Sequence, residues 1–247
     1  MTNSKLISLI LFALVIVLLL SSTILAVGMQ KYYKAYLNRG LHPLGSDSKH
    51  LAVIIPEGKR SIVIVGDSRA QHWNTQGDFW RKWEIFNLGH SGSTSAQTNL
   101  IQEKIEVEGI ANVVLICVGI NDLKALYFFE NTKQQITNAL VGNIKILANK
   151  HALAGSDIII CNVFPEGRNG GIRRLVWASD MQQIIESVNQ DLFSVCQQNN
   201  YQYLDAYSIV MAGKKSTPAK SEYYKDFLHL NDNGYAVLND ELEKLID

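Results

Sequence analysis

Short apolar runs alternate with longer helix-like stretches from Arg60 onward, and this alternation restricts the fold more than any other feature of the chain. Strands are predicted for five runs: Ser61–Val65, Glu84–Asn87, Asn112–Val118, Asp157–Phe164 and Tyr201–Asp205. Helices are predicted for the stretches between and after them: Thr94–Glu108, Thr132–Lys150, Ala178–Asn199 and Asn231–Ile246. The central runs are continuously apolar, which is typical of strands buried on both faces of a parallel sheet. The pattern therefore predicts a three-layer α/β/α domain with a central parallel sheet of about five strands.

The N-terminal segment carries no charge from Leu6 to Val27. A helix of about 20 apolar residues is long enough to cross a bilayer, so the segment predicts a transmembrane anchor. In the alternative interpretation it is a signal peptide, with Leu9–Leu20 as its apolar core and a cleavage site near Ala26–Gly28. The uncharged stretch is longer than the apolar core of an ordinary signal peptide, which favours the anchor.

Three parts are expected along the chain: the anchor or signal segment over residues 1–30, a connector over 31–59, and one domain over 60–247. The connector is polar and rich in residues that break helices and strands. Within it, the run "LAVII" predicts a short strand at the edge of the domain, ended by Pro56.

Charge and cysteine content exclude several classes of function. The chain has 23 basic and 23 acidic residues and no basic run, so nucleic acid is not an expected partner. Its three cysteines form no C-x-x-C motif and no cluster with histidine. We therefore expect buried free thiols rather than a zinc site or a disulfide framework, and no metal or other cofactor.

Polar residues gather where the predicted strands end. Ser68 follows the first strand in "GDSR", Gly92 follows the second in "NLGHSGST", and Asn121 follows the third in "GIND". Asp226 and His229 lie in "DFLHLNDNGY", just before the last helix. The carboxyl ends of parallel strands meet at one edge of a sheet, where ligands bind. A serine, a histidine and a carboxylate at that edge are the groups that nucleophilic acyl transfer requires.

These four segments resemble the sequence blocks of the SGNH hydrolases, also called the GDSL esterase/lipase family. The order of the Ser, Gly, Asn and Asp-x-x-His blocks is that of the family, and the resemblance extends from about Arg60 to the C-terminus. It implies a flavodoxin-like fold and a serine esterase. One departure is Arg69, which stands where the family name has leucine. Whether this cation faces the substrate or a structural carboxylate is left open by the sequence.

The resemblance assigns a role to each residue. Ser68 is the nucleophile, His229 the general base, and Asp226 the carboxylate that orients the imidazole. The Ser68 N–H, the Gly92 N–H and the Asn121 amide form the oxyanion hole. Gly89 lies in the same loop as Gly92 and is an alternative for that position.

Simpler interpretations exist for each motif taken alone. Gly-Asp-Ser after a strand is common as a turn or a helix cap, and "GIND" reads equally well as a turn. The stretch "GHSGS" nearly matches the G-x-S-x-G elbow, but Ser93 occupies its last position, which makes Ser91 a poor competitor for the nucleophile. Asp67 and Asp122 are expected to accept structural hydrogen bonds rather than to catalyse.

The natural ester is not fixed by the motifs. No long apolar lid segment is evident, which favours a short acyl group such as acetyl on a carbohydrate or small ester over a lipid. The loop from Pro165 to Leu175 is either solvated or a rim for an anionic or sugar-rich ligand, through Arg168, Arg173 and Arg174. The stretch Ala212–Lys225 is expected to form another rim.

Two other functions stay open from the sequence. One is a carbohydrate O-acyltransferase that uses the same acyl-enzyme, and the other is a non-catalytic binding domain of the cell envelope. The small excess of positive charges after the apolar segment (Lys31, Lys34 and Arg39, against Lys5 and the α-amino group before it) favours a cytoplasmic domain by the positive-inside rule. N-terminal anchors usually export a hydrolytic domain, however, so we expect it to be extracytoplasmic, either anchored or secreted after cleavage.

Overall fold

The computed structural model describes residues 3–42, 51–167, 171–211 and 220–246. The chain divides into two compact units, Met1–Arg39 and Gly40–Asp247. The structure confirms the predicted fold class, a mixed α/β domain built around a parallel five-stranded sheet and preceded by a long apolar helix.

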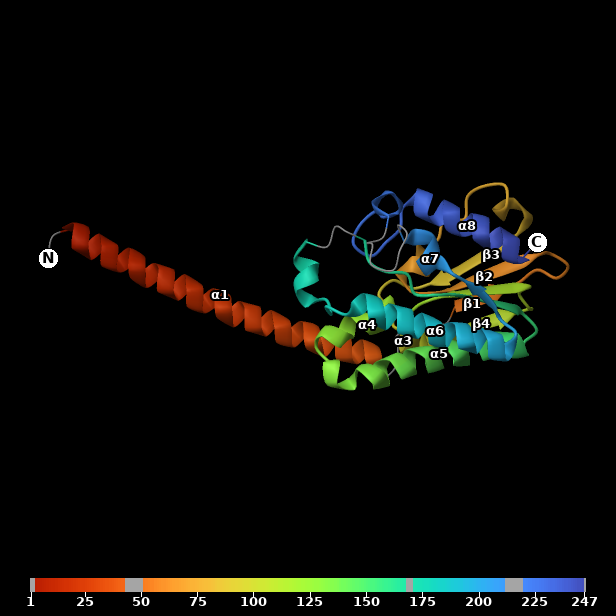
Figure 1. The fold of residues 1–247 in the computed structure, drawn as a ribbon, viewed down its shortest axis with the longest axis horizontal. Coiled ribbons are helices and arrows are strands. Elements are labelled where there is room, and N and C mark those ends of the chain that lie inside the picture. Colours follow the sequence, from red (N-terminus) through yellow and green to blue (C-terminus); the bar gives the residue numbers. More distant parts are fainter. Residues whose placement is uncertain (1–2, 43–50, 168–170, 212–219, 247) are drawn as a thin grey trace. The chain divides into compact units, whose positions relative to one another are not determined.

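Helix α1 (Asn3–Leu41) is the N-terminal apolar segment (Figure 1). Its stretch from Ile7 to Leu41 has a mean hydropathy of 2.9 in its most apolar part, and none of that part is buried. At 1.5 Å per residue, this stretch is about 50 Å long, which exceeds the roughly 30 Å of a bilayer's hydrocarbon core. It is the one helix in the described residues that is long and apolar enough to cross a membrane, as an anchor or a signal sequence. The helix also continues into the first part of the predicted connector.

The central sheet has the strand order β3-β2-β5-β6-β7, and every neighbouring pair is parallel. Its strands are β2 (Ser61–Gly66), β3 (Glu84–Gly89), β5 (Val113–Cys117), β6 (Asp157–Cys161) and β7 (Gln202–Leu204). All five lie where the sequence predicts strands. The chain passes from β2 to β3 on one side and then to β5 on the other, so the direction of winding reverses beside β2. In open α/β sheets such a reversal opens a crevice at the carboxyl ends of the strands.

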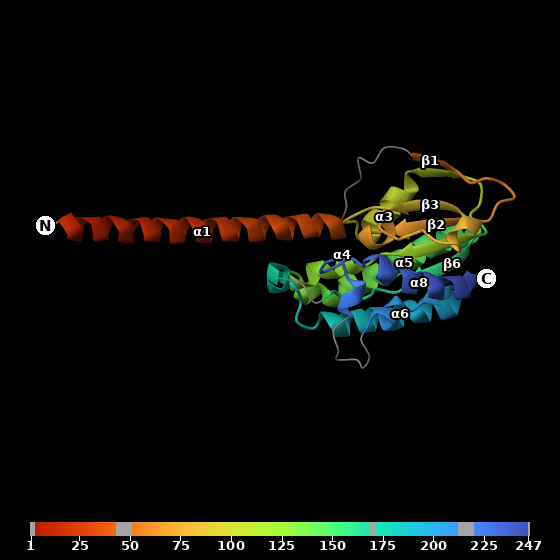
Figure 2. The same cartoon turned by 90° about the horizontal axis from the view of Figure 1, so that it is seen from above.

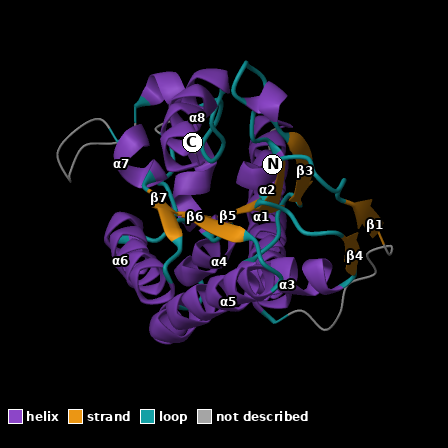
Figure 3. Ribbon diagram, turned by 90° about the vertical axis from the view of Figure 1, so that its right-hand side faces the viewer, coloured by secondary structure: helices purple, strands orange, loops and turns teal. Residues whose placement is uncertain are grey.

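Helices cover both faces of this sheet (Figure 3). Alternate side chains of β2 point to opposite faces, so Val63 and Val65 enter one hydrophobic cluster while Ile62 and Ile64 enter the other. Helices α5 (Lys133–Leu153) and α6 (Met181–Asn199) pack on the first cluster, and α7 (Ala206–Val210) and α8 (Asp232–Ile246) pack on the second. Shorter elements complete the domain: α2 (Ser68–Gln71), α3 (Ser95–Glu103), α4 (Ile120–Leu123), and the 3₁₀ turns η1 (Trp80–Lys82), η2 (Lys124–Tyr127), η3 (Glu130–Thr132), η4 (Gly171–Val176) and η5 (Ser221–Tyr223).

The predicted helix Thr94–Glu108 is wrong at its C-terminal end. Helix α3 stops at Glu103, and Ile105–Glu108 form strand β4. This strand pairs in parallel with β1 (Leu51–Ile54), the strand predicted from "LAVII". The two form a separate small sheet beyond the β3 edge of the central sheet (Figure 2). In "IEVE" apolar and acidic residues alternate with a period of two, which is a strand signal that the preceding helical pattern obscured.

Candidate active site

Ser68 lies at the carboxyl edge of the sheet because β2 ends abruptly beside β5. A Cβ at Gly66 would lie 1.8 Å from the Cys117 carbonyl oxygen, so only glycine permits this approach. Asp67 follows and caps α2, where its carboxylate accepts a hydrogen bond of 2.8 Å from the Arg69 N–H. Ser68 is therefore the first residue of α2, in a turn that is held by the close approach of β2 to β5.

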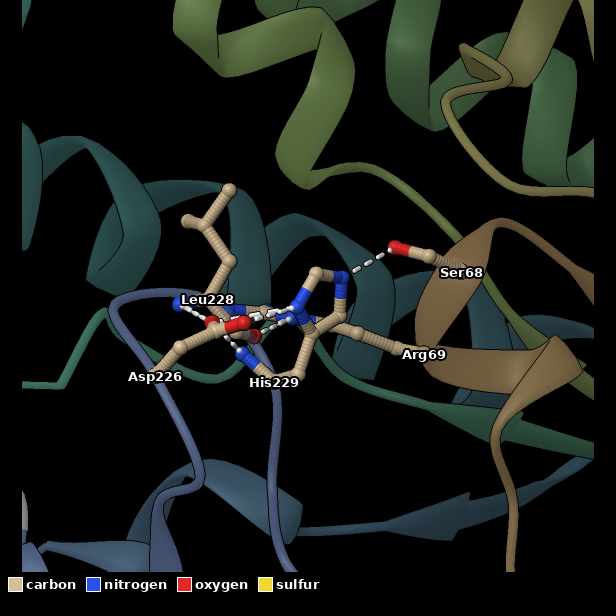
Figure 4. Close-up of polar contacts among 5 residues, drawn as sticks. All are labelled: Ser68, Arg69, Asp226, Leu228 and His229. Atoms are coloured by element: carbon tan, nitrogen blue, oxygen red, sulfur yellow. Dashed lines mark hydrogen bonds and ion pairs between the residues drawn. The ribbon is translucent and has the colours of Figure 1, made fainter. Parts of the chain in front are cut away.

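His229 lies between Ser68 and Asp226 (Figure 4). Its Nε2 is 2.9 Å from Ser68 Oγ, and its Nδ1 is 3.0 Å and 2.9 Å from the two carboxylate oxygens of Asp226. Asp226 also accepts hydrogen bonds from the backbone N–H groups of Leu228 (2.7 Å) and His229 (3.0 Å). The structure thus brings together the three residues that the sequence assigns to a triad. This geometry permits the imidazole to accept the Ser68 proton while its other nitrogen donates to a carboxylate.

The Asp226 carboxyl group is held in its ionised form. Burial alone would raise its pKa, but the hydrogen bond with His229 and the two backbone N–H donors outweigh burial and lower the pKa to about 2. The carboxylate is therefore charged throughout the neutral range, as a partner of a transient imidazolium must be.

The N–H groups of Ser68 and Gly92 are two of the three donors that the sequence predicts for an oxyanion hole. Within the part of the chain that the structure describes, neither the Ser68 N–H nor the Gly92 N–H has a hydrogen-bond partner. Gly92 is exposed and adopts a φ of +81°, which favours glycine. Gly89 differs, because its N–H already donates to Asn87 Oδ1 at 3.0 Å and a Cβ there would lie 2.3 Å from the Gln71 nitrogen. Gly89 therefore serves the packing of α2.

The Asn121 side chain is the third predicted donor. It is buried, and its Nδ2 donates to the Ser93 carbonyl oxygen at 2.9 Å. Its Oδ1 accepts a hydrogen bond of 2.7 Å from Lys124 Nζ. One hydrogen of Nδ2 remains for another acceptor.

Two buried aspartates join the loops that carry these groups. The Asp67 carboxylate accepts a hydrogen bond from the Gly119 N–H (3.3 Å), which connects the loop after β2 to the loop after β5. Asp122 accepts hydrogen bonds from the Ser95 N–H (2.9 Å) and hydroxyl (2.6 Å), which connects the loop after β5 to the start of α3. Both aspartates act as structural acceptors, as the sequence predicts.

Asp122 makes the stability of the fold depend on pH. Complete burial raises its pKa most strongly and outweighs the Ser95 hydrogen bonds, giving a pKa of about 7 against 3.8 for the ordinary group. Between these values the folded state binds more protons than the unfolded state. This contribution to stability is thus complete below pH 3.8 and is lost as the pH rises through 7.

Asn at position 122 mimics the protonated acid and does not titrate. We therefore expect the unfolding free energy of Asp122→Asn, relative to the natural chain, to improve by roughly a few kcal/mol between pH 4 and pH 7. Urea denaturation at each pH measures this difference. A difference that stays constant over the range would contradict the raised pKa.

Ser91 does not compete with Ser68 in this geometry. Its hydroxyl donates to the side-chain oxygen of Gln71, whereas the neighbouring His90 contacts Ser93. Arg173 and Arg174 of the proposed cationic rim are exposed in η4, and Arg168 lies outside the described residues. Most of the other proposed rim, residues 212–219, also lies outside them.

Three residues near the site carry contacts that sequence reasoning missed. Arg69 is buried, and its guanidinium donates to the backbone carbonyl oxygens of Phe164, Pro165 and Leu228. The ring of exposed His72 lies edge-on to that of His229, with centroids 5.2 Å apart. Lys124 is the third, and its spacing of three residues from Asn121 was an available signal, since such residues share one side of a helical turn.

No metal site is apparent beside these groups. Among the residues that the structure describes, no three His, Cys, Asp or Glu side chains lie close enough to hold a metal ion.

The parallel sheet, with a serine, a histidine and a carboxylate at its carboxyl edge, defines an α/β protein of the serine-hydrolase class. The chain belongs to the GDSL-like lipase/acylhydrolase family, whose sequence profile matches residues 64–237. It is therefore an enzyme of a family that hydrolyses esters, and the resemblance seen in the sequence is confirmed. A search of curated proteins by sequence finds no match.

Solved structures share the fold. A Streptococcus pneumoniae protein provisionally described as a platelet activating factor has a TM-score of 0.63 at 17% identity, covering 90% of this chain and 99% of its own. A GDSL-like lipase from Bacteroides thetaiotaomicron has a TM-score of 0.55 at 21% identity, covering 87% and 96%. A catalytic mutant of an acetylxylan esterase from Geobacillus stearothermophilus has a TM-score of 0.55 at 16% identity, covering 77% and 94%. At these identities the likeness shows the fold alone.

Proposed function

We propose that this enzyme is a serine esterase that cleaves short-chain, O-acetyl-type esters through Ser68, His229 and Asp226. The observation that carries the proposal is the continuous contact from Ser68 Oγ through the His229 ring to the Asp226 carboxylate. Ser68 Oγ attacks the ester carbonyl carbon while His229 Nε2 takes the hydroxyl proton. The imidazolium then gives that proton to the leaving alcohol, and water repeats the sequence on the acyl-enzyme.

The negative charge of the tetrahedral intermediate needs donors that are in place before reaction. The N–H groups of Ser68 and Gly92 and the free Nδ2 hydrogen of Asn121 are proposed to supply them. Removing one such donor typically lowers kcat by a factor of 10²–10³. An acceptor other than water, such as a sugar hydroxyl, would take the acyl group by the same chemistry.

Two observations support a short acyl group. The sequence has no long apolar lid segment beside the site, and one protein of the same fold is an acetylxylan esterase. The test is to assay the full chain in detergent against p-nitrophenyl acetate, butyrate and octanoate. We expect kcat/KM to fall by about tenfold or more from acetate to octanoate. Each added CH₂ contributes its ~0.8 kcal/mol of binding free energy only where apolar surface of the enzyme covers it. A preference for octanoate would contradict the short acyl group but not the esterase.

We also propose that α1 holds the catalytic domain at a membrane on the extracytoplasmic side. The support is the uncharged segment from Leu6 to Val27, which is long enough to span a bilayer. Protease added outside intact cells would then degrade the domain. Protection of the domain in intact cells, with degradation after lysis, would place it in the cytoplasm instead.

A further inference from the structure

Lys124 begins η2, directly after the short helix α4 that carries Asn121. Its side chain is only partly exposed, and its Nζ lies 2.7 Å from Asn121 Oδ1. Burial lowers the pKa of its ammonium group, while the nearby Asp67 carboxylate raises it. Placing an ammonium group in a partly buried position has an energetic cost, which the hydrogen bond to Asn121 offsets in part.

The two contacts of the Asn121 amide allow a single orientation. An ammonium group only donates hydrogen bonds, so the amide atom that faces Lys124 has to be the oxygen. A backbone carbonyl only accepts, so the atom that faces Ser93 has to be the nitrogen. A rotation of the amide by 180° would place an ammonium against N–H hydrogens and two oxygens against each other. The contacts therefore hold Asn121 with its nitrogen in one fixed place.

The orientation matters because the two ends of an amide have opposite effects on an oxyanion. The nitrogen end stabilises developing negative charge, whereas the oxygen end repels it. A donor that is already oriented costs no reorganisation when the charge develops. In addition, a cation on the amide oxygen polarises the amide and strengthens its N–H groups as donors.

We propose that Lys124 is a positioning residue for the reaction: it fixes and polarises the Asn121 amide so that the free Nδ2 hydrogen serves the oxyanion. The inference rests on the proposed esterase function and assigns Lys124 no contact with the substrate. It predicts an effect on the chemical step that passes entirely through Asn121.

The test is a double-mutant cycle in the full chain, with p-nitrophenyl acetate as substrate. Lys124→Met is expected to lower kcat about tenfold or more, with KM changed less than twofold. Asn121→Ala is expected to lower kcat by a factor of 10²–10³. The double variant is expected to be no slower than Asn121→Ala alone, because Lys124 then has no amide to orient. Lys124→Arg keeps a donor and is expected to recover most of the activity.

A matched control is Lys150→Met, since Lys150 Nζ also donates a partly buried hydrogen bond to a neutral oxygen, that of Gln102, away from the site. It is expected to keep the natural kcat. Melting temperatures within a few degrees of the natural chain would show that each variant is folded. If Lys124→Met is not folded, Lys124→Arg takes its place in the test.

Three outcomes would overturn the positioning role. The first is full activity of Lys124→Met, and the second is no effect of Asn121→Ala. The third is that Lys124→Met lowers kcat by the same factor in the natural chain and in the Asn121→Ala variant. These outcomes are distinguishable from failure of the esterase mechanism, which would appear as activity that survives loss of the Ser68 hydroxyl.

Discussion

Alanine at position 68 is expected to lower kcat on p-nitrophenyl acetate by about 10⁴-fold or more, with KM little changed. The hydroxyl is the only group of Ser68 that can form the acyl-enzyme, and His229 then has no proton to take. Both backbone donors of the proposed oxyanion hole remain, so a small residual rate above the background is expected. The fold should persist, since the substitution removes one oxygen from a side chain that is already largely buried.

The matched control for this prediction is Ser91→Ala. Ser91 lies in the loop after β3 and its hydroxyl contacts Gln71 rather than a histidine. Its removal is expected to leave kcat within about twofold of the natural value, as is usual for an exposed group. A fluorophosphonate probe should label the natural chain and Ser91→Ala, but not Ser68→Ala. Labelling that maps to Ser91, or activity that survives Ser68→Ala, would contradict the proposed nucleophile.

The sequence predicted the sheet well because buried parallel strands leave a direct pattern. The central runs have continuous apolar stretches such as "IVIV" and "VVLICV", and each predicted run lies within a residue or two of the observed strand except the fourth. That strand ends at Cys161, and the side chain of the next residue, Asn162, donates to Tyr203 and Asp205. The missed β4 depends on pairing with β1, which is distant in the sequence, and local periodicity reports no such contact.

The candidate site was predictable to the extent that its residues are short polar side chains at strand ends. Ser68, Asn121, Asp226 and His229 stand where the resemblance and the strand pattern place them. The contacts of long side chains were not predictable. The reach of Arg69 to Pro165 and Leu228 depends on three segments that come together only in the folded chain.

The partners of Arg69 make it the residue near the site whose loss should most affect stability. It is 2% exposed, and its guanidinium donates from Nε to Leu228 O at 3.1 Å and from a terminal nitrogen to Pro165 O at 3.1 Å. A further N–H bonds the Phe164 carbonyl, and the guanidinium carbon lies 3.8 Å from the centre of the Phe164 ring. One side chain thus ties α2 to the segment after β6. It also holds Leu228, in the loop before His229 (Figure 4).

Methionine at position 69 fills similar space but donates no hydrogen bond. The buried carbonyl groups of Phe164 and Leu228 would then lack their donor, whereas Pro165 O keeps its hydrogen bond from the Tyr224 hydroxyl. Each unpaired carbonyl costs about 1–3 kcal/mol. We expect Arg69→Met to lose at least ~2 kcal/mol of unfolding free energy, which corresponds to a fall in Tm of roughly 4–8 °C for a domain of this size. Leucine, the residue of the family name, is expected to cost as much, and lysine nearly as much, because one ammonium group cannot reach all three carbonyls.

Arg81→Met is the control, because Arg81 pairs with Asp78 on the surface, where both side chains are more than 80% exposed. Such a pair contributes at most about 1 kcal/mol, so the Tm of this variant should change little.

The Arg69 variants carry a second expected effect. Leu228 O is held by Arg69 and the Leu228 N–H by Asp226, so the loop that presents His229 is held at both backbone polar groups of Leu228. Below their melting temperatures, Arg69→Met and Arg69→Leu should therefore show a lower kcat on p-nitrophenyl acetate. A Tm within 2 °C of the natural chain would show that water replaces the guanidinium, and that the cation beside the nucleophile is not required by the fold.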